Sequence, residues 1–207
     1  TLVLHHLTTL QKQELLAVIS RHGGTKFAPI LRLATSDADN GIRVQAASAL
    51  ARIDDEFLPR EQELSAAILE NPTDAQQLLK LGRLYDEYSG AGVLGADREH
   101  ESREKALAAY GDYLMLSSGD VDARVAVSRL LIADGRFHDA IRHLESWVRE
   151  DGSSAALLLL YMEALFRLRR FNDVRQVAAK HQRTLAQAGD VSIEAREAVK
   201  LWMGATA

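Results

Sequence analysis

The chain has no cysteine among its 207 residues. Disulfides, thiolate metal sites and cysteine nucleophiles are therefore excluded. It has only three prolines, so long uninterrupted helices can form. Neither sign of charge is in large excess. The chain has 25 lysines and arginines and 29 aspartates and glutamates, which gives a net charge of −4. Nucleic-acid binding requires a clustered basic face, so we expect no nucleic-acid partner.

Long hydrophobic runs are also missing. The longest spans residues 155–162 and ends at Glu163, whereas a membrane-spanning helix needs about 20 apolar residues. The apolar stretch at residues 2–4 is too short for a signal peptide. The chain begins with Thr1 and not methionine, so we expect a processed or shortened protein, and the earlier presence of an upstream segment, a membrane anchor included, stays open. The length of 207 residues fits one domain or two small ones, and the apolar fraction of 47% is ordinary for a globular protein.

An internal repeat is present, with a period of about 34 residues. The segment 135–140, Gly-Arg-Phe-His-Asp-Ala, recurs at 169–174 as Arg-Arg-Phe-Asn-Asp-Val. The same step back from Ala140 reaches Ala106, so three segments share one period. A fixed period of this length is typical of an array of helix pairs.

The repeat resembles the tetratricopeptide repeat. The first helix of that family carries a large residue, then Leu-Gly and Tyr, which Leu78, Leu81, Gly82 and Tyr85 supply. The second helix carries a small residue followed by large ones, as at Ala106, Tyr110 and Tyr113, and again at Ala140, Leu144 and Trp147. Ser128 and Met162 replace the glycine, so the later repeats are degenerate. About 12 extra residues precede Ala106, and we expect a loop there, at residues 89–97.

The upstream region resembles a HEAT-type repeat. Pro29 begins one helix, an acidic turn follows at residues 37–41, and apolar residues recur on one face of the next helix, at 42, 46, 49, 50 and 53. Residues 2–22 are predicted to form a helix with an apolar stripe, which contains Leu7, Leu10, Leu15 and Ile19. Residues 56–70 are predicted to form a bridging helix with three inward residues, Leu64, Ile68 and Leu69. Residues 193–203 are predicted to form a helix that caps the end of the array.

No segment shows the two-residue alternation with β-branched enrichment that is typical of strands. We therefore predict an all-α fold, an α-solenoid of helix pairs with one HEAT-like region, about three degenerate tetratricopeptide repeats and a C-terminal capping helix. The predicted boundaries are 1–55 for the HEAT-like region, 56–73 for the bridging helix, 74–188 for the repeats and 189–207 for the capping helix.

Enzyme chemistry has little support. Gly90, Gly92 and Gly95 have the spacing of a dinucleotide fingerprint, but they follow a predicted helix where that site requires a strand. His100-Glu101 resembles the start of a zinc-protease helix, yet residue 104 is glutamate and not the second histidine. No histidine falls in a recognisable catalytic order. We expect no catalytic residue, no cofactor and no metal.

Repeat arrays of this kind bind partners on their concave face, which is lined by first-helix residues. The repeat register places eleven residues on that face: Leu79, Arg83, Asp86, Glu87, Val125, Arg129, Ile132, Leu159, Glu163, Phe166 and Arg167. One interpretation is a groove for a peptide or helix, in which charged groups surround a few apolar anchors. The other interpretation is a solvated face of mixed charge.

The order of these features resembles the cytoplasmic region of the PelE family, components of bacterial Pel exopolysaccharide synthesis and export in biofilms. The resemblance rests on residues 39–46 and 81–88, the repeated pair Phe137 and Phe171, and residues 198–202. It implies a non-enzymatic protein-interaction scaffold at the cytoplasmic face of the inner membrane, with membrane helices in an upstream segment that is missing here. It implies partners of the PelD (cyclic-di-GMP receptor), PelF (glycosyltransferase) and PelG (transporter) types. Two alternatives stay open: a tetratricopeptide adaptor of another bacterial assembly machine, and an accessory repeat domain of a larger enzyme.

Overall fold

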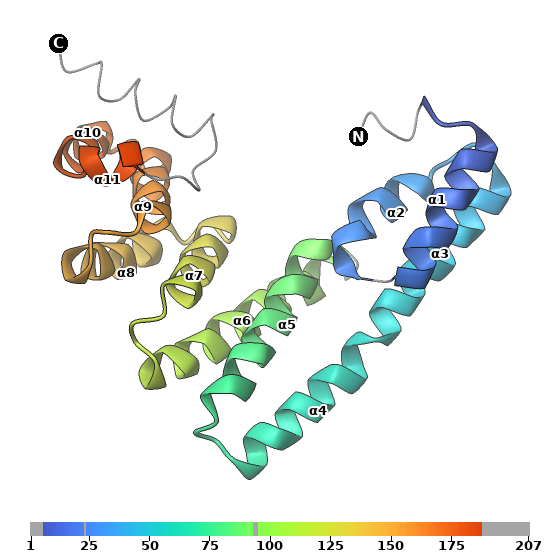
Figure 1. Cartoon of the computed structure of the whole chain (residues 1–207), viewed down its shortest axis with the longest axis horizontal. Helices are drawn as coiled ribbons and strands as arrows, with labels where there is room; N and C mark the ends of the chain where they lie inside the picture. The colour runs from blue at the N-terminus through green and yellow to red at the C-terminus, as the bar shows by residue number, and fades with distance from the viewer. Residues whose placement is uncertain (1–5, 23, 93–94, 188–207) are drawn as a thin grey trace. The chain divides into compact units, whose positions relative to one another are not determined.

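The computed structural model describes residues 6–22, 24–92 and 95–187, and every regular element in these ranges is a helix (Figure 1). The predicted all-α, solenoid-like fold of helix pairs is confirmed. The chain divides into two compact units, residues 1–116 and residues 117–207. The following paragraphs describe each unit by itself.

The first unit begins with α1 (Thr9–His22), the short 3-10 helix η2 (Thr25–Phe27), α2 (Ala28–Ala34) and α3 (Asn40–Asp55). Pro29 lies in the first turn of α2, where its missing N–H costs no hydrogen bond. Asp39 begins α3 because its carboxylate accepts a hydrogen bond from the N–H of Ile42 at 3.1 Å. The unit continues with α4 (Phe57–Glu70), α5 (Ala75–Ala91) and α6 (Ala96–Leu116).

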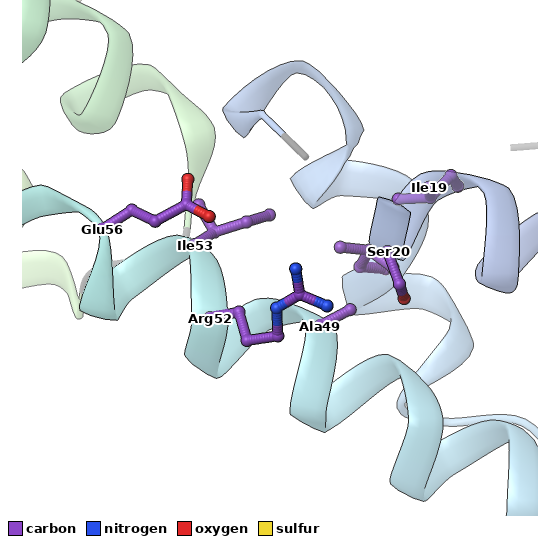
Figure 2. Close-up of a pocket in the computed structure, with 7 residues that line it drawn as sticks. Ile19, Ser20, Ala49, Arg52, Ile53 and Glu56 are labelled. Atoms are coloured by element: carbon purple, nitrogen blue, oxygen red, sulfur yellow. The ribbon is translucent and has the colours of Figure 1, made fainter. Parts of the chain in front are cut away.

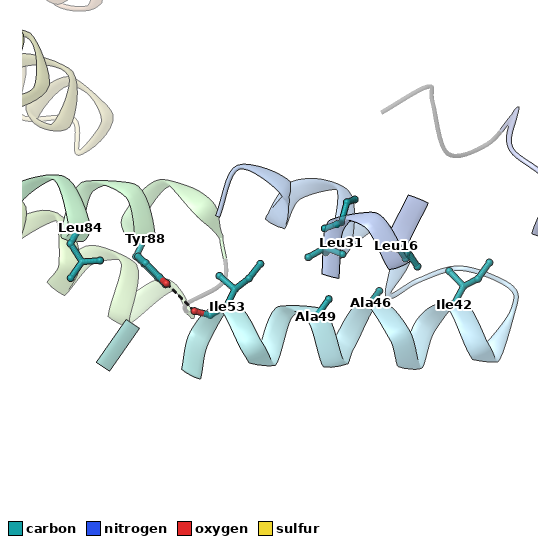
Figure 3. Packing of buried hydrophobic residues seen from close by; sticks show 10 residues of the cluster. Leu16, Leu31, Ile42, Ala46, Ala49, Ile53, Leu84 and Tyr88 are labelled. Atoms are coloured by element: carbon teal, nitrogen blue, oxygen red, sulfur yellow. Dashed lines mark hydrogen bonds between the residues drawn. The ribbon is translucent and has the colours of Figure 1, made fainter. Parts of the chain in front are cut away.

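The HEAT-like region and the first tetratricopeptide-like helix share one hydrophobic core (Figure 3). Leu16, Leu31 and Ile42 of α1–α3 belong to the same buried cluster as Leu84 and Tyr88 of α5. The Tyr88 hydroxyl donates a hydrogen bond to the carbonyl oxygen of Ile53 at 3.0 Å. The boundary between the two compact units falls after residue 116, and the predicted segment boundary at residue 55 stays a prediction.

The predicted helix faces are mostly correct. In α3 the buried residues are Ile42, Ala46, Ala49 and Ile53, as predicted, and Leu50 is half-buried. In α1 the prediction is wrong for Leu10, which is 66% exposed, while Leu16 is fully buried. Six residues separate them, which is about 240° around a helix. Leu69 of α4 is also wrongly predicted as inward, because it is 83% exposed and lies about 140° from Leu64.

The predicted loop at residues 89–97 is mostly helix. α5 continues to Ala91 and α6 begins at Ala96. Ser89 and Ala91 are buried, so α5 gains packing by continuing through them. Gly92 then ends the helix in the left-handed conformation, with φ 68°. The extra residues therefore lengthen the first helix pair, and Val93 and Leu94 lie outside the described residues.

The second unit contains two helix pairs with the same spacing. α7 (Val121–Ala133) and α9 (Ala155–Arg167) begin and end one repeat period apart, and α8 (Phe137–Glu150) and α10 (Phe171–Lys180) begin one period apart. Their N-caps also correspond, since Asp120 accepts from the N–H of Ala123 and Ser154 from that of Leu157. α11 (Gln182–Gln187) follows. The predicted capping helix at 189–207 lies outside the described residues.

Candidate protein-binding groove

A groove with a volume of about 510 Å³ lies between α4 and α5, which run side by side (Figure 1). Its wall on α4 consists of residues spaced i, i+3, i+4 and i+7, a pattern that brings them to one helix face: Arg60, Glu63, Leu64 and Ala67. Its wall on α5 is built in a similar way from Gln77, Lys80, Arg83, Leu84 and Glu87. The groove belongs entirely to the first unit.

One end of the groove is held by hydrogen bonds and an ion pair. The Thr25 hydroxyl donates to Oε1 of Glu87 at 2.5 Å, and a guanidinium nitrogen of Arg60 lies 4.0 Å from Oε2 of the same carboxylate. Glu87 therefore connects η2, α4 and α5. Because this carboxylate already has two partners, we expect it to position the groove and not to bind a ligand.

The aromatic contacts between α4 and α5 make this arrangement rigid. The Phe57 ring packs against the rings of Tyr85 and Tyr88, at centroid distances of 5.9 Å and 4.7 Å. The Tyr85 hydroxyl donates to a carboxylate oxygen of Glu61 at 2.7 Å. Burial, together with the nearby Glu61 carboxylate, raises the pKa of Tyr85 well above its usual value. The hydroxyl therefore stays protonated and keeps donating.

The groove combines an apolar floor with basic groups. Leu84 is buried, and Leu64 and Ala67 are half-buried. Lys80 and Arg83 are exposed, and within the described part of the chain neither side chain makes a hydrogen bond or ion pair. An apolar strip bordered by available cations is complementary to an amphipathic segment that carries carboxylates.

The four residues of α5 that the sequence places on the concave face differ in location and burial in the structure. Arg83 and Glu87 line the groove. Asp86 is half-buried and accepts a hydrogen bond from the Tyr110 hydroxyl of α6 at 3.4 Å. Leu79 is only 8% exposed, so its prediction as a surface residue is corrected. α5 packs against both α4 and α6, and this double packing buries a broader face than the repeat register suggests.

The other seven predicted residues belong to the second unit. Arg129, Phe166 and Arg167 are exposed, and the remaining four are half-buried, namely Val125, Ile132, Leu159 and Glu163. Arg167 forms an ion pair with Glu163 at 3.3 Å. That these residues and those of α5 form one binding surface stays a prediction.

Sequence reasoning missed the contribution of α4. It assigned this helix a bridging role, whereas every residue of α4 is at least partly exposed and several line the groove. The sequence does contain a signal for this wall of the groove. Arg60, Glu63, Leu64 and Ala67 are spaced so that charged and apolar residues share one face of the helix, beside its inward apolar face. Lys80 was missed because the register used for α5 selected Leu79, Arg83, Asp86 and Glu87 and passed over it.

A second cavity lies among α1, α2 and α3 (Figure 2). Ile19, Ala49 and Ile53 contribute its apolar walls, and Arg52 and Glu56 lie at its edge. Its volume is about 10 Å³, which is at most enough for one water molecule. It is therefore a packing defect and not a ligand site.

In the described ranges, no cluster of three or more histidines and carboxylates is close enough to hold a metal ion. In the same ranges, no helix has both the length and the apolar character that crossing a membrane requires. No protein-family model matches the chain, and no curated protein matches it.

Proposed function

We propose that the chain is a non-catalytic protein-interaction scaffold, and that its α4–α5 groove binds an acidic amphipathic segment of a partner protein. One observation carries this proposal: a groove of about 510 Å³ in which Leu64, Ala67 and Leu84 form an apolar floor beside Lys80 and Arg83. Groove recognition of a helix needs a few apolar anchors and charges of the opposite sign. The rigid contacts behind the groove reduce the entropic cost of binding.

The resemblance to the PelE family supplies the more specific form of the proposal. In that form the chain belongs to a complex for Pel exopolysaccharide synthesis and export at the cytoplasmic face of the bacterial inner membrane. Its partners are then of the PelD, PelF or PelG type. A tetratricopeptide adaptor of another machine would use the same groove with a different partner, and an accessory domain of a larger enzyme would have a catalytic domain beside it.

The test is calorimetric titration of the chain with the cytoplasmic region of a PelD-type receptor, with and without cyclic-di-GMP. We expect saturable binding near one to one. The double variant Lys80→Ala/Arg83→Ala should weaken it about tenfold or more, because charged contacts that are lost from an interface cost about 1–3 kcal/mol. Arg21→Ala removes an exposed cation from α1 and is the matched control.

The outcomes separate the two levels of the proposal. Binding that the double variant leaves unchanged would contradict the groove but keep the scaffold. Absence of binding to PelD-type and PelF-type proteins would contradict the Pel assignment. Arg129→Ala tests whether the second unit takes part, since Arg129 is exposed on α7.

A further inference from the structure

The turn between α9 and α10 exposes aromatic and basic side chains together. Residues 166–171 read Phe-Arg-Leu-Arg-Arg-Phe. Phe166 is 48% exposed and Phe171 is 38% exposed, and their ring centroids lie 5.6 Å apart. The three arginines between them are all exposed. Two partly exposed rings with three cations between them in the sequence are unusual in a chain whose net charge is −4.

The equivalent turn of the preceding repeat shows that the backbone does not require Phe166, Arg167 or Arg169. Residues 132–137 read Ile-Ala-Asp-Gly-Arg-Phe. In both turns the helix closes in the same way: the N–H of Arg136 donates to the carbonyl of Leu131 at 2.8 Å, and the N–H of Arg170 to that of Leu165 at 2.9 Å. The turn therefore adopts the same hydrogen-bonded conformation whether it contains one arginine or three.

Arg169 occupies a backbone conformation that favours glycine. Its φ is 59°, and the residue at the equivalent position is Gly135, with φ 74°. For a residue with a Cβ this conformation is sterically unfavourable. Such local strain commonly marks a position that is kept for function.

The charge of this turn is only partly compensated. Arg170 pairs with Asp173 at 2.6 Å and Arg167 with Glu163 at 3.3 Å, whereas the side chain of Arg169 makes no ion pair or hydrogen bond with the described residues. Six basic and two acidic residues fall between positions 163 and 183. This end of the second unit is therefore locally positive.

We propose that the α9–α10 turn docks onto an anionic phospholipid surface. Phe166 and Phe171 would enter the interfacial region, and Arg167 and Arg169 would bind lipid phosphates, for which the guanidinium is well suited. A turn between two helices offers much less than the roughly 800 Å² per partner that a stable protein interface buries, whereas a bilayer needs no matching shape. This inference goes beyond the proposed function and does not depend on it.

The docking should be weak and sensitive to salt. Each arginine near an anionic bilayer contributes about 1 kcal/mol, which is about a fivefold change in partition. The contribution falls when the Debye length shortens. The turn therefore binds the bilayer reversibly and does not anchor the chain alone.

The test is flotation of the whole chain with phosphatidylcholine vesicles, with and without phosphatidylglycerol, at low and high salt. We expect binding only to the vesicles with phosphatidylglycerol and only at low salt. Arg169→Gly should weaken binding about fivefold while it raises the unfolding midpoint, a combination that a purely structural role cannot produce. Phe166→Ser should also weaken binding. Arg142→Ala removes an exposed cation from α8 and should leave binding unchanged.

Three results would overturn the proposal. The first is equal binding to neutral and anionic vesicles, and the second is no binding to either at low salt. The third is unchanged binding by Arg169→Gly. If polyglutamate bound the chain in an Arg169-dependent manner while vesicles did not, the turn would instead be a site for an acidic protein segment.

Discussion

A Cβ atom added to Gly82 would lie 2.9 Å from Cδ1 of the Tyr110 ring. The Tyr110 ring therefore packs directly on the backbone of α5, and only glycine leaves room for it. In the second unit the equivalent pairs are Ser128 with Leu144 and Met162 with Ala178, and all four side chains are buried. As the residue on the first helix of each pair becomes larger, the residue on the second helix becomes smaller. The repeats differ in sequence but keep a similar packed volume.

Gly82→Ala should destabilise the first unit by about 1–2 kcal/mol. The new methyl group meets a buried ring that cannot move away, and the higher helix propensity of alanine offsets only part of that cost. Gly90→Ala is the matched control in α5, because no atom lies within 4 Å of the added Cβ. This control should stabilise the unit by about 0.5–1 kcal/mol. Urea unfolding followed by circular dichroism measures both, and equal effects would contradict the close contact.

Because a larger side chain on one helix is matched by a smaller one on the other, we expect substitutions at the two paired positions to have non-additive effects on stability. Ser128→Met alone should cost about 1–3 kcal/mol by overpacking, and Leu144→Ala alone should cost about 2–5 kcal/mol by leaving a cavity. The double variant reproduces the arrangement of Met162 and Ala178, so it should be more stable than the sum predicts by at least about 0.5 kcal/mol. A double-mutant cycle from urea unfolding measures the coupling. Strict additivity would show that the two side chains do not face each other.

Arg169→Gly should stabilise the second unit by about 1 kcal/mol, because glycine adopts a positive φ without the steric cost of a Cβ. Gly135→Ala at the equivalent turn should destabilise it by a similar amount, since its φ is 74° and the surrounding space is open. Thermal unfolding of both variants measures the two effects. A loss of stability in Arg169→Gly would mean that the arginine side chain contributes more than its backbone strain costs.

The stability of the second unit should fall as the pH drops from about 7 to 5. Burial, reinforced by the nearby Arg142 charge, lowers the pKa of His143, and burial, with Lys180 beside it, lowers the pKa of His181. In the unfolded chain these histidines take up protons at about pH 6.5. Below that pH the unfolded state binds protons that the folded state does not, so the free energy of unfolding decreases.

Urea unfolding at several pH values measures this dependence. The double variant His143→Gln/His181→Gln should show a smaller decrease between pH 7 and 5. His138→Gln alters an exposed histidine of α8 and is the control, so it should retain the decrease. A slope that the double variant keeps in full would assign the effect to other groups.

The sequence predicted the features that depend on residues close together in the chain. The helices and the apolar face of α3 follow from the local spacing of apolar residues, and the acidic turn at residues 37–41 precedes α3 as predicted. The repeat period reappears in the ends of α7 and α9 for the same reason. These features were predictable because each one repeats a local pattern that the sequence displays directly.

The tertiary structure decided the features that depend on packing between distant segments. Tyr88 belongs to the buried cluster of α1–α3, so the HEAT-like region and α5 share one core. Leu79 is buried because α5 packs on two neighbours, and helix periodicity cannot show how many neighbours a helix has. The groove likewise arises from α4 lying beside α5, which brings Leu64 and Arg83 together although they are far apart in the sequence. Local spacing specifies one helix face, and only the packed neighbours decide whether that face is core or binding surface.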